Sequence, residues 1–265
     1  MGPERRWLRR RPARVSVLLA IALTSAVSVP VTANVAASAP SHQPPRTGGY
    51  FKTLPPGAKL PSGATCAKRV HRSAWEPRPQ NKTANHKIPK YVKLPDNPDF
   101  NAAWQAKYKS RINGNFRGTT DEIIQWASCK WGINDDLTRA RAVNESDWVQ
   151  KTYGDYEPRS SGHCPPGWNV GDPCPTSFGL LQVKWYFQPG TYPRTNVSTA
   201  FNLDATLAET RGCLDGMGWF GPQSRGKIWG CVGVWFSGQW GQGYDSYIAR
   251  AQRNFSRKPW LSWNG

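Results

Sequence analysis

The chain reads Thr119-Thr-Asp-Glu-Ile-Ile-Gln-Trp-Ala-Ser-Cys-Lys-Trp-Gly132 near its middle, and this stretch sets the fold class. Thr119 or Thr120 can cap a helix, and Asp121 and Glu122 suit its first turn, where the helix dipole favours negative charge. Gly132 can end the helix. The stretch therefore predicts an α-helix with defined ends at both sides.

Four other stretches also favour helices. Asn134-Asp-Asp-Leu-Thr-Arg-Ala-Arg-Ala-Val143 begins with capping residues and carries apolar residues at helical spacing, so that Glu145 falls at the end of this helix. We expect further helices over 100–108, 198–212 and 227–235, the last of these being the final helix. Strand patterns are few. The chain is therefore expected to be mainly α, with a small hairpin or sheet within residues 153–190.

The first 33 residues predict a secretory signal peptide, because a positively charged start is followed by an apolar run and then by small residues. The apolar run from Val15 to Val29 is stopped by Pro30, short of the roughly 20 residues that a spanning helix needs. We expect cleavage after Ala33. No second run of this length follows, so stable membrane insertion is not expected after cleavage. The predicted location is outside the cell, at the cell wall.

The mature chain divides into three parts by composition. Residues 34–62 are rich in Ala, Pro, Ser and Gly without an apolar period, which predicts a flexible linker. Residues 63–118 stay rich in Pro and Lys but gain large apolar side chains such as Trp75. They are expected to form an irregular N-terminal arm on the domain of residues 119–265.

Six cysteines in an exported chain indicate disulfides. Six cysteines allow 15 pairings, and short loops close most easily. Zinc is the alternative use, but no CxxC or HExxH spacing occurs and the histidines are scattered. We expect no metal and no other cofactor. The expected pairs are Cys164–Cys174 and Cys213–Cys231, which leaves Cys66–Cys129.

The net charge of the chain indicates which class of partner it binds. The formal net charge is +18, and +13 remains without residues 1–33. Such a field favours polyanions. Export argues against nucleic acid, whereas wall polymers rich in phosphate or carboxylate fit better. Anionic wall polymers are therefore the expected partners, and a merely solvated basic surface is the alternative.

Four motifs follow one another in the second half of the chain. They are Ala142-Val-Asn-Glu-Ser-Asp-Trp148, Ser177-Phe-Gly-Leu-Leu-Gln-Val183, Ala200-Phe-Asn-Leu203 and Val234-Trp-Phe-Ser-Gly-Gln-Trp240. In this order they resemble the lysozyme-like superfamily, in particular soluble lytic transglycosylases and goose-type lysozymes, of the secreted actinobacterial type. The resemblance implies a lysozyme-like fold, and a monomeric enzyme that cleaves the MurNAc–GlcNAc β-1,4 bond in the glycan strands of peptidoglycan.

Glu145 is the candidate catalytic residue. Glycosidic cleavage needs an acid that is still protonated near neutral pH. Burial among aromatic side chains raises a carboxyl pKa. Glu145 lies close in sequence to Trp148 and at a helix C-terminus, where negative charge is disfavoured. The alternative is a surface glutamate paired with Arg141, four residues earlier.

A second carboxylate, which most glycosidases require, is not obvious. Asp147, Asp155, Asp172 and Asp204 are present, but none stands out. The transglycosylases that the chain resembles use one glutamate as acid and base, and the sugar's own N-acetyl group or 6-hydroxyl completes the reaction to a 1,6-anhydro product. The absence of a partner therefore favours a transglycosylase over a hydrolase.

The resemblance also implies substrate-binding residues. Gln182 would contact substrate or the loop that faces Glu145, Gly179 would let the backbone approach closely, and Asn202 would line the cleft. The complete set is Ser146, Trp148, Ser177, Gly179, Gln182, Asn202, Trp235 and Phe236.

The last motif departs from the family. It has Trp235-Phe-Ser where the transglycosylases have Tyr-Asn, so a tyrosine contact to the glutamate would have to come from Tyr244 or Tyr247. Two alternatives to the enzyme remain: a non-catalytic wall- or glycan-binding protein on the same fold, and another hydrolase such as an amidase or a chitosanase.

Overall fold

Helix α4 (Thr120–Trp131) begins and ends where the sequence predicts. The Thr119 hydroxyl accepts the Glu122 backbone N–H at 3.3 Å, and the Glu122 carboxylate accepts the Thr119 N–H at 3.0 Å. This reciprocal capping box satisfies two donors that a helix start leaves open. Gly132 ends the helix with a left-handed φ of 60°. Every residue of α4 is buried, so it belongs to the core rather than to the surface.

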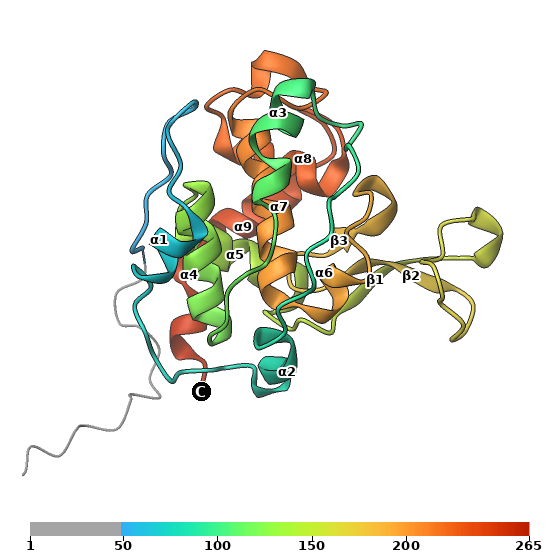
Figure 1. Ribbon diagram of the computed structural model, residues 1–265, viewed down its shortest axis with the longest axis horizontal. Helices are drawn as coiled ribbons and strands as arrows, with labels where there is room; N and C mark the ends of the chain where they lie inside the picture. Colours follow the sequence, from blue (N-terminus) through green and yellow to red (C-terminus); the bar gives the residue numbers. More distant parts are fainter. Residues whose placement is uncertain (1–48, 265) are drawn as a thin grey trace, which may run out of the picture. The chain divides into compact units, whose positions relative to one another are not determined.

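The computed structural model describes residues 49–264 (Figure 1). The expected signal peptide, its cleavage site and the linker up to residue 48 lie outside the described residues. Within residues 49–264, no helix is both long and apolar enough to cross a bilayer.

Helices make up 47% of the described chain. Three long ones match the sequence expectations: α5 (Asp135–Ser146), α7 (Thr199–Leu214) and α8 (Ile228–Ser237). The expectation that α8 is the last helix is wrong, because α9 (Asp245–Arg257) follows it and packs on α5. The short helices are α1 (Gly63–Ala67), α2 (Lys82–Asn85), α3 (Ala102–Lys107) and α6 (Arg194–Val197).

Helix α7 lies at the centre of the helical body, with α4 and α8 packed against it (Figure 1). All of its residues except Glu209 are buried. One of the possible second carboxylates, Asp204, is used inside this core: it accepts hydrogen bonds from Lys130 Nζ at 2.6 Å and Trp131 Nε1 at 2.7 Å. Asp204 therefore holds α7 to α4 and is not available for chemistry.

A three-stranded antiparallel sheet projects beside the helices (Figure 1). It consists of β1 (Tyr153–Glu157), β2 (Cys174–Phe178) and β3 (Val183–Lys184), in that order. Tyr153 lies opposite Phe178, which lies opposite Val183 in the next pair. The expected small sheet within residues 153–190 is therefore present.

The arm that precedes α4 is packed rather than loose. Asp135 at the start of α5 accepts the backbone N–H groups of Tyr50 and Phe51, and Arg211 of α7 donates to the carbonyl of Leu54 at 2.9 Å. Residues 49–62, the second half of the expected linker, thus have fixed partners. The physical reason is that Asp135 and Arg211 are buried charged groups, which need hydrogen-bond partners and find them in the backbone of residues 49–62.

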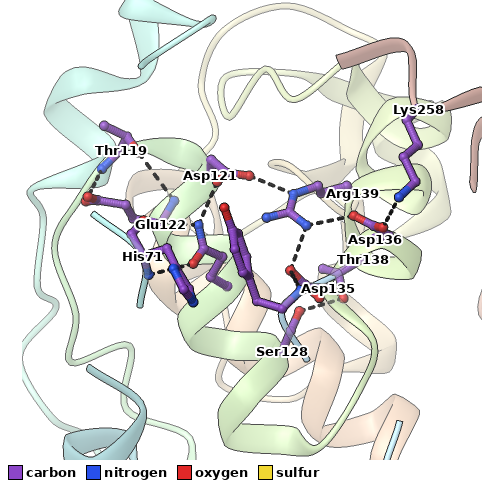
Figure 2. A network of polar contacts seen from close by, with 12 residues as sticks. His71, Thr119, Asp121, Glu122, Ser128, Asp135, Asp136, Thr138, Arg139 and Lys258 are labelled. Atoms are coloured by element: carbon purple, nitrogen blue, oxygen red, sulfur yellow. Dashed lines mark hydrogen bonds and ion pairs between the residues drawn. The ribbon is translucent and has the colours of Figure 1, made fainter. Parts of the chain in front are cut away.

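A buried ionic cluster joins α4, α5 and the end of α9 (Figure 2). The fully buried guanidinium of Arg139 contacts Asp121 at 2.7 Å, Asp135 at 2.7 Å and Asp136 at 2.8 Å. Lys258 reaches Asp136 from the other side at 2.6 Å. The surrounding carboxylates raise the pKa of Arg139. Since removing Arg139 would leave Asp121 and Asp135 charged without an ion pair in the core, the cluster fixes how these helices meet.

The three disulfides are Cys66–Cys129, Cys164–Cys174 and Cys213–Cys231, which confirms the expected pairing. They tie the arm to α4, close the loop between β1 and β2, and join α7 to α8. The described chain is thus helix-rich, with a small antiparallel sheet and three disulfides.

Candidate functional site

The four sequence motifs meet at one turn, which spans residues 179–182 between β2 and β3. The Ser146 hydroxyl at the end of α5 donates to the Leu180 carbonyl at 2.8 Å. The Asn202 amide oxygen in α7 accepts the Leu181 N–H at 2.9 Å. Trp235 Nε1 in α8 donates to the Leu181 carbonyl at 3.1 Å. Segments that are far apart in sequence are therefore held together by side chains that the motifs supply.

Gly179 lets this turn approach α7. Its φ is +82°, in the left-handed region that L side chains rarely adopt, and an added Cβ would lie 2.3 Å from Asn202 Nδ2 and 2.7 Å from the Thr195 carbonyl. The close approach expected at Gly179 is therefore to the protein's own core.

Glu145 lies in the last turn of α5, where α9 faces it. The Tyr247 hydroxyl of α9 donates a hydrogen bond to Glu145 Oε1. The neighbouring Asn144 holds α9 in place, because its Nδ2 donates to the Tyr247 carbonyl at 3.2 Å and its Oδ1 accepts from Asn254 Nδ2 at 3.1 Å. Tyr247, one of two tyrosines considered from the sequence, thus provides the contact that the last motif lacks.

The environment of Glu145 keeps a proton on its carboxyl near neutral pH. Burial raises the pKa of Glu145 to about 7, although the Tyr247 hydrogen bond and the charge of Arg141 act in the opposite direction. The negative charge of Asp155 raises the pKa further. A carboxyl with a pKa near 7 can both give and take a proton at neutral pH, which suits general acid–base chemistry.

Arg141 is not the surface partner of Glu145 that the alternative reading requires. Its side chain is fully buried, and its Nη1 donates to Thr210 Oγ1 of α7 at 2.8 Å. The guanidinium lies 5.6 Å from the ring centre of Trp235. Arg141 therefore sits beneath the site, and its charge acts on Glu145 without a direct ion pair among the described salt bridges.

Asp155, one of the four aspartates considered as a second carboxylate, acts on Glu145 through its charge. It lies in β1, is exposed, and accepts the Ser177 hydroxyl at 2.6 Å. Its charge acts on Glu145, whereas Asp172 accepts the Arg159 N–H in the loop and Asp147 ends α5 with a left-handed φ of 50°. Asp155 lies in β1 and Glu145 in α5, two different elements, so no local sequence pattern marks their interaction.

Several expected substrate contacts prove to be internal. Trp148 is fully buried, and its ring packs against Trp75, Trp260 and Trp263, so it belongs to the core. Asn202 is also fully buried and does not line a cleft, since its amide group bonds the turn and the Thr195 carbonyl. Both corrections have the same cause: these side chains stabilise the turn and helix that carry the site.

Of the remaining residues expected to bind substrate, some form hydrogen bonds inside the protein and others are accessible at the surface. Ser177 is buried and bonded to Asp155, and Ser146 bonds the turn. Phe236 is 53% exposed and stacks on Tyr247 with ring centres 4.7 Å apart, next to Glu145. Trp235 and Gln182 are half-buried and line a pocket.

That pocket has a volume of about 270 Å³ and extends from Gln182 and Trp235 to Glu209 and Asp99. Glu209 is the single residue of α7 that is not buried in the helical core. The sequence motifs gave no signal for these two acids, since they come from α7 and from the arm. Among residues 49–264, no group of three or more His, Cys, Asp or Glu is placed to hold a metal ion.

Comparison of the chain with models of known protein families, with curated protein sequences and with solved structures finds no match.

Proposed function

We propose that this protein is a secreted, lysozyme-like enzyme that cleaves the glycan strands of peptidoglycan, with Glu145 as its general acid and base. The observation that carries the proposal is the environment of Glu145: a carboxyl at a helix end, with a pKa near 7 and a tyrosine hydroxyl bound to it. Glycosidic cleavage requires an acid of this kind.

The meeting of the four motifs supports the same assignment. The resemblance to lytic transglycosylases and goose-type lysozymes rests on motif order, and these motifs are joined through the turn at residues 179–182. The exposed ring of Phe236 stacks on Tyr247, which bonds Glu145, and the half-buried ring of Trp235 lines the pocket. Aromatic faces of this kind suit the apolar faces of sugar rings.

In the proposed reaction, protonated Glu145 gives its proton to the glycosidic oxygen as the bond to the sugar C1 breaks. The resulting carboxylate then accepts a proton from the 6-hydroxyl of MurNAc, whose oxygen attacks C1 and closes a 1,6-anhydro ring. Glu145 ends in its starting state. The Tyr247 hydrogen bond stabilises the carboxylate that exists between the two steps.

A hydrolytic reaction is the second candidate, because the charge of a second carboxylate, that of Asp155, raises the pKa of Glu145. Inverting glycosidases use such a second carboxylate to activate water. Mass spectrometry of digested muropeptides separates the two reactions: anhydro ends identify a transglycosylase, and reducing MurNAc ends identify a hydrolase. Free peptides would instead identify an amidase.

The secreted location and the wall partner are part of the proposal. The predicted signal peptide and the three disulfides, which are typical of oxidising compartments, support export. The net charge of +13 that remains without residues 1–33 supports retention on an anionic wall.

The test is the Glu145→Gln variant in a turbidity assay on purified walls. We expect at least about a 100-fold loss of clearing rate, since the amide cannot transfer the proton. Asp147→Asn is the matched control: it removes an exposed carboxylate two residues away and keeps a residue that tolerates the left-handed φ of 50°. It should clear walls at the wild-type rate. Unchanged clearing by Glu145→Gln, or none by the wild type, contradicts the enzyme and favours a binding protein.

A further inference from the structure

The pocket beside the candidate site differs in charge from the rest of the chain. The sequence has 35 Lys and Arg against 17 Asp and Glu. The described residues that line the pocket nevertheless include two acids, Asp99 and Glu209, and no Lys, Arg or His. In such a basic protein, a pocket with this lining excludes anions and favours a cation.

The polar groups of the pocket offer acceptors. Glu209 already accepts from Gln188 Nε2 at 3.0 Å and from Asn97 Nδ2 at 3.2 Å, which orients its carboxyl. Gln188 is 5% exposed and lines the pocket, and among the described residues its Oε1 atom has no hydrogen-bond partner. Within residues 49–264, the Asp99 carboxyl forms no hydrogen bond or ion pair. A buried acceptor without a donor is costly, so a group that brings N–H donors would suit this set.

The walls of the pocket are aromatic. Phe100 and Phe220 are buried, whereas Trp219 is 52% exposed and Phe187 is 55% exposed. The Cys213–Cys231 disulfide lies in the lining and joins α7 to α8, which keeps the pocket rigid. Aromatic faces attract cations through the ring quadrupole. Exposed rings at the edge of an acidic pocket are therefore suited to an organic cation rather than to a hydrated metal ion.

We propose that this pocket binds a primary ammonium group carried by the wall polymer. An ammonium has three donors and no acceptor, which matches Asp99, Glu209 and Gln188 Oε1. The volume of about 270 Å³ is smaller than the roughly 300–1,000 Å³ of pockets that enclose a whole small molecule. It therefore accommodates a substituent, while the polymer continues along Gln182 and Trp235.

The charged groups around the pocket are consistent with such an occupant. Burial and the charge of Asp99 raise the pKa of Glu209, and burial raises the pKa of Asp99. The opposing charge of Arg141, which faces Glu209 from α5, lowers the pKa of Glu209. A bound ammonium would keep both carboxyls ionised and would replace their mutual repulsion by attraction.

The identity of the polymer rests on the proposed function, but the recognition of an ammonium does not. Two sources carry a primary amine in a wall: the side chain of a diamino acid in the peptide, and a sugar without its N-acetyl group. Both are tested without turnover, by calorimetric titration of the wild-type protein at neutral pH and low salt. The probes are Nα-acetyl-lysine against Nα,Nε-diacetyl-lysine, and glucosamine against N-acetylglucosamine.

We expect at least one amine to bind about tenfold more tightly than its acetylated form, because acetylation removes the charge that the carboxylates attract. Binding of the lysine derivative identifies the peptide as the source, and binding of glucosamine identifies the glycan. Equal binding of amine and acetylated probe, no binding of either, or binding of calcium chloride in place of both amines overturns the proposal.

Variants locate the bound probe. Asp99→Asn and Glu209→Gln should each weaken amine binding by about tenfold, as expected when one carboxylate partner of the bound ammonium is removed. Asp96→Asn is the matched control, since Asp96 lies in the same arm but pairs with Lys109 outside the pocket. Loss of affinity in Asp96→Asn alone would overturn the assignment. A protein that binds amines yet leaves walls intact would contradict the proposed enzyme and leave the pocket assignment standing.

Discussion

At the scale of single residues, the proton affinity of Glu145 is set by opposing neighbours. Burial and the charge of Asp155 raise its pKa, whereas the Tyr247 hydroxyl and the charge of Arg141 lower it. The pKa near 7 is thus a balance, and each neighbour can be removed separately. Because the acid must be protonated to act, activity should fall as the pH rises through about 7.

Tyr247→Phe tests this balance. The variant loses a hydrogen bond that stabilises the carboxylate, so the pKa of Glu145 rises and the falling limb of the pH–activity profile moves to higher pH. We expect a shift of about one pH unit, because a hydrogen bond to a charged group contributes on the order of 1.5 kcal/mol. The profile of kcat/KM on purified walls measures it.

Asp155→Asn should shift the pH–activity profile in the opposite direction to Tyr247→Phe. Removing its negative charge lowers the pKa of Glu145, so the falling limb moves to lower pH. The shift should be smaller than that of Tyr247→Phe, since Asp155 is exposed and solvent screens its charge. A loss of rate at every pH, in place of a shift, would instead identify Asp155 as a base in hydrolysis. If the pH–activity profile is the same as that of the wild type in both variants, these neighbours do not set the pKa of Glu145.

At the scale of elements, the turn of residues 179–182 connects the sheet to three helices. Its carbonyl and N–H groups bond to Ser146, Asn202 and Trp235, which lie on α5, α7 and α8. The motif residues therefore act mainly by fixing where the elements lie. The approach of the turn to α7 depends on the absence of a side chain at Gly179.

Gly179→Ala should destabilise the protein by about 3 kcal/mol, the sum of a left-handed conformation and of overpacking against α7. Gly238→Ala is the matched control. Its φ is +68°, but no atom lies within 4 Å of an added Cβ, so only the conformational cost of about 1 kcal/mol applies. Urea unfolding measures both. Equal losses in the two variants would show that the turn does not press on α7.

Element bounds were largely predictable because helix ends carry local signals. Thr119 and Asn134 cap the helices that follow them, as expected, and Ser198 caps α7 in the same way. Helix α9 was missed although Tyr247 and Ala251 are four residues apart and both buried. Missing this helix also left its contact to Glu145 unassigned between Tyr244 and Tyr247.

At the scale of the whole molecule, the arm and the domain form one packed body within residues 49–264. Tyr50 and Phe51, which precede the arm, donate backbone N–H groups to Asp135, and Cys66 of the arm is bonded covalently to Cys129 of α4. Asp99 of the arm then completes the acidic pocket. The arm therefore contributes to the surface around the candidate site as well as to stability.

The disulfides should differ in their effect on stability. Cys66 and Cys129 are 63 positions apart, whereas Cys164 and Cys174 are 10 apart. Because a longer loop loses more entropy on closure, the Cys66→Ser/Cys129→Ser variant should lose about 4 kcal/mol and the Cys164→Ser/Cys174→Ser variant about 3 kcal/mol. Denaturant unfolding measures the free energies. A larger loss from the short loop would contradict this loop-entropy explanation.

The sequence by itself determined the helix class, the disulfide pairs, the candidate acid and the turn motif. Each of these depends on signals between near neighbours, on loop length or on motif order, all of which a linear chain displays. The tertiary structure alone decided that Trp148 and Asn202 are internal, that Tyr247 bonds Glu145, and that Asp155 acts on it through its charge. These properties depend on burial and on distance between elements, and both arise only when α5, α7, α9 and the sheet pack together.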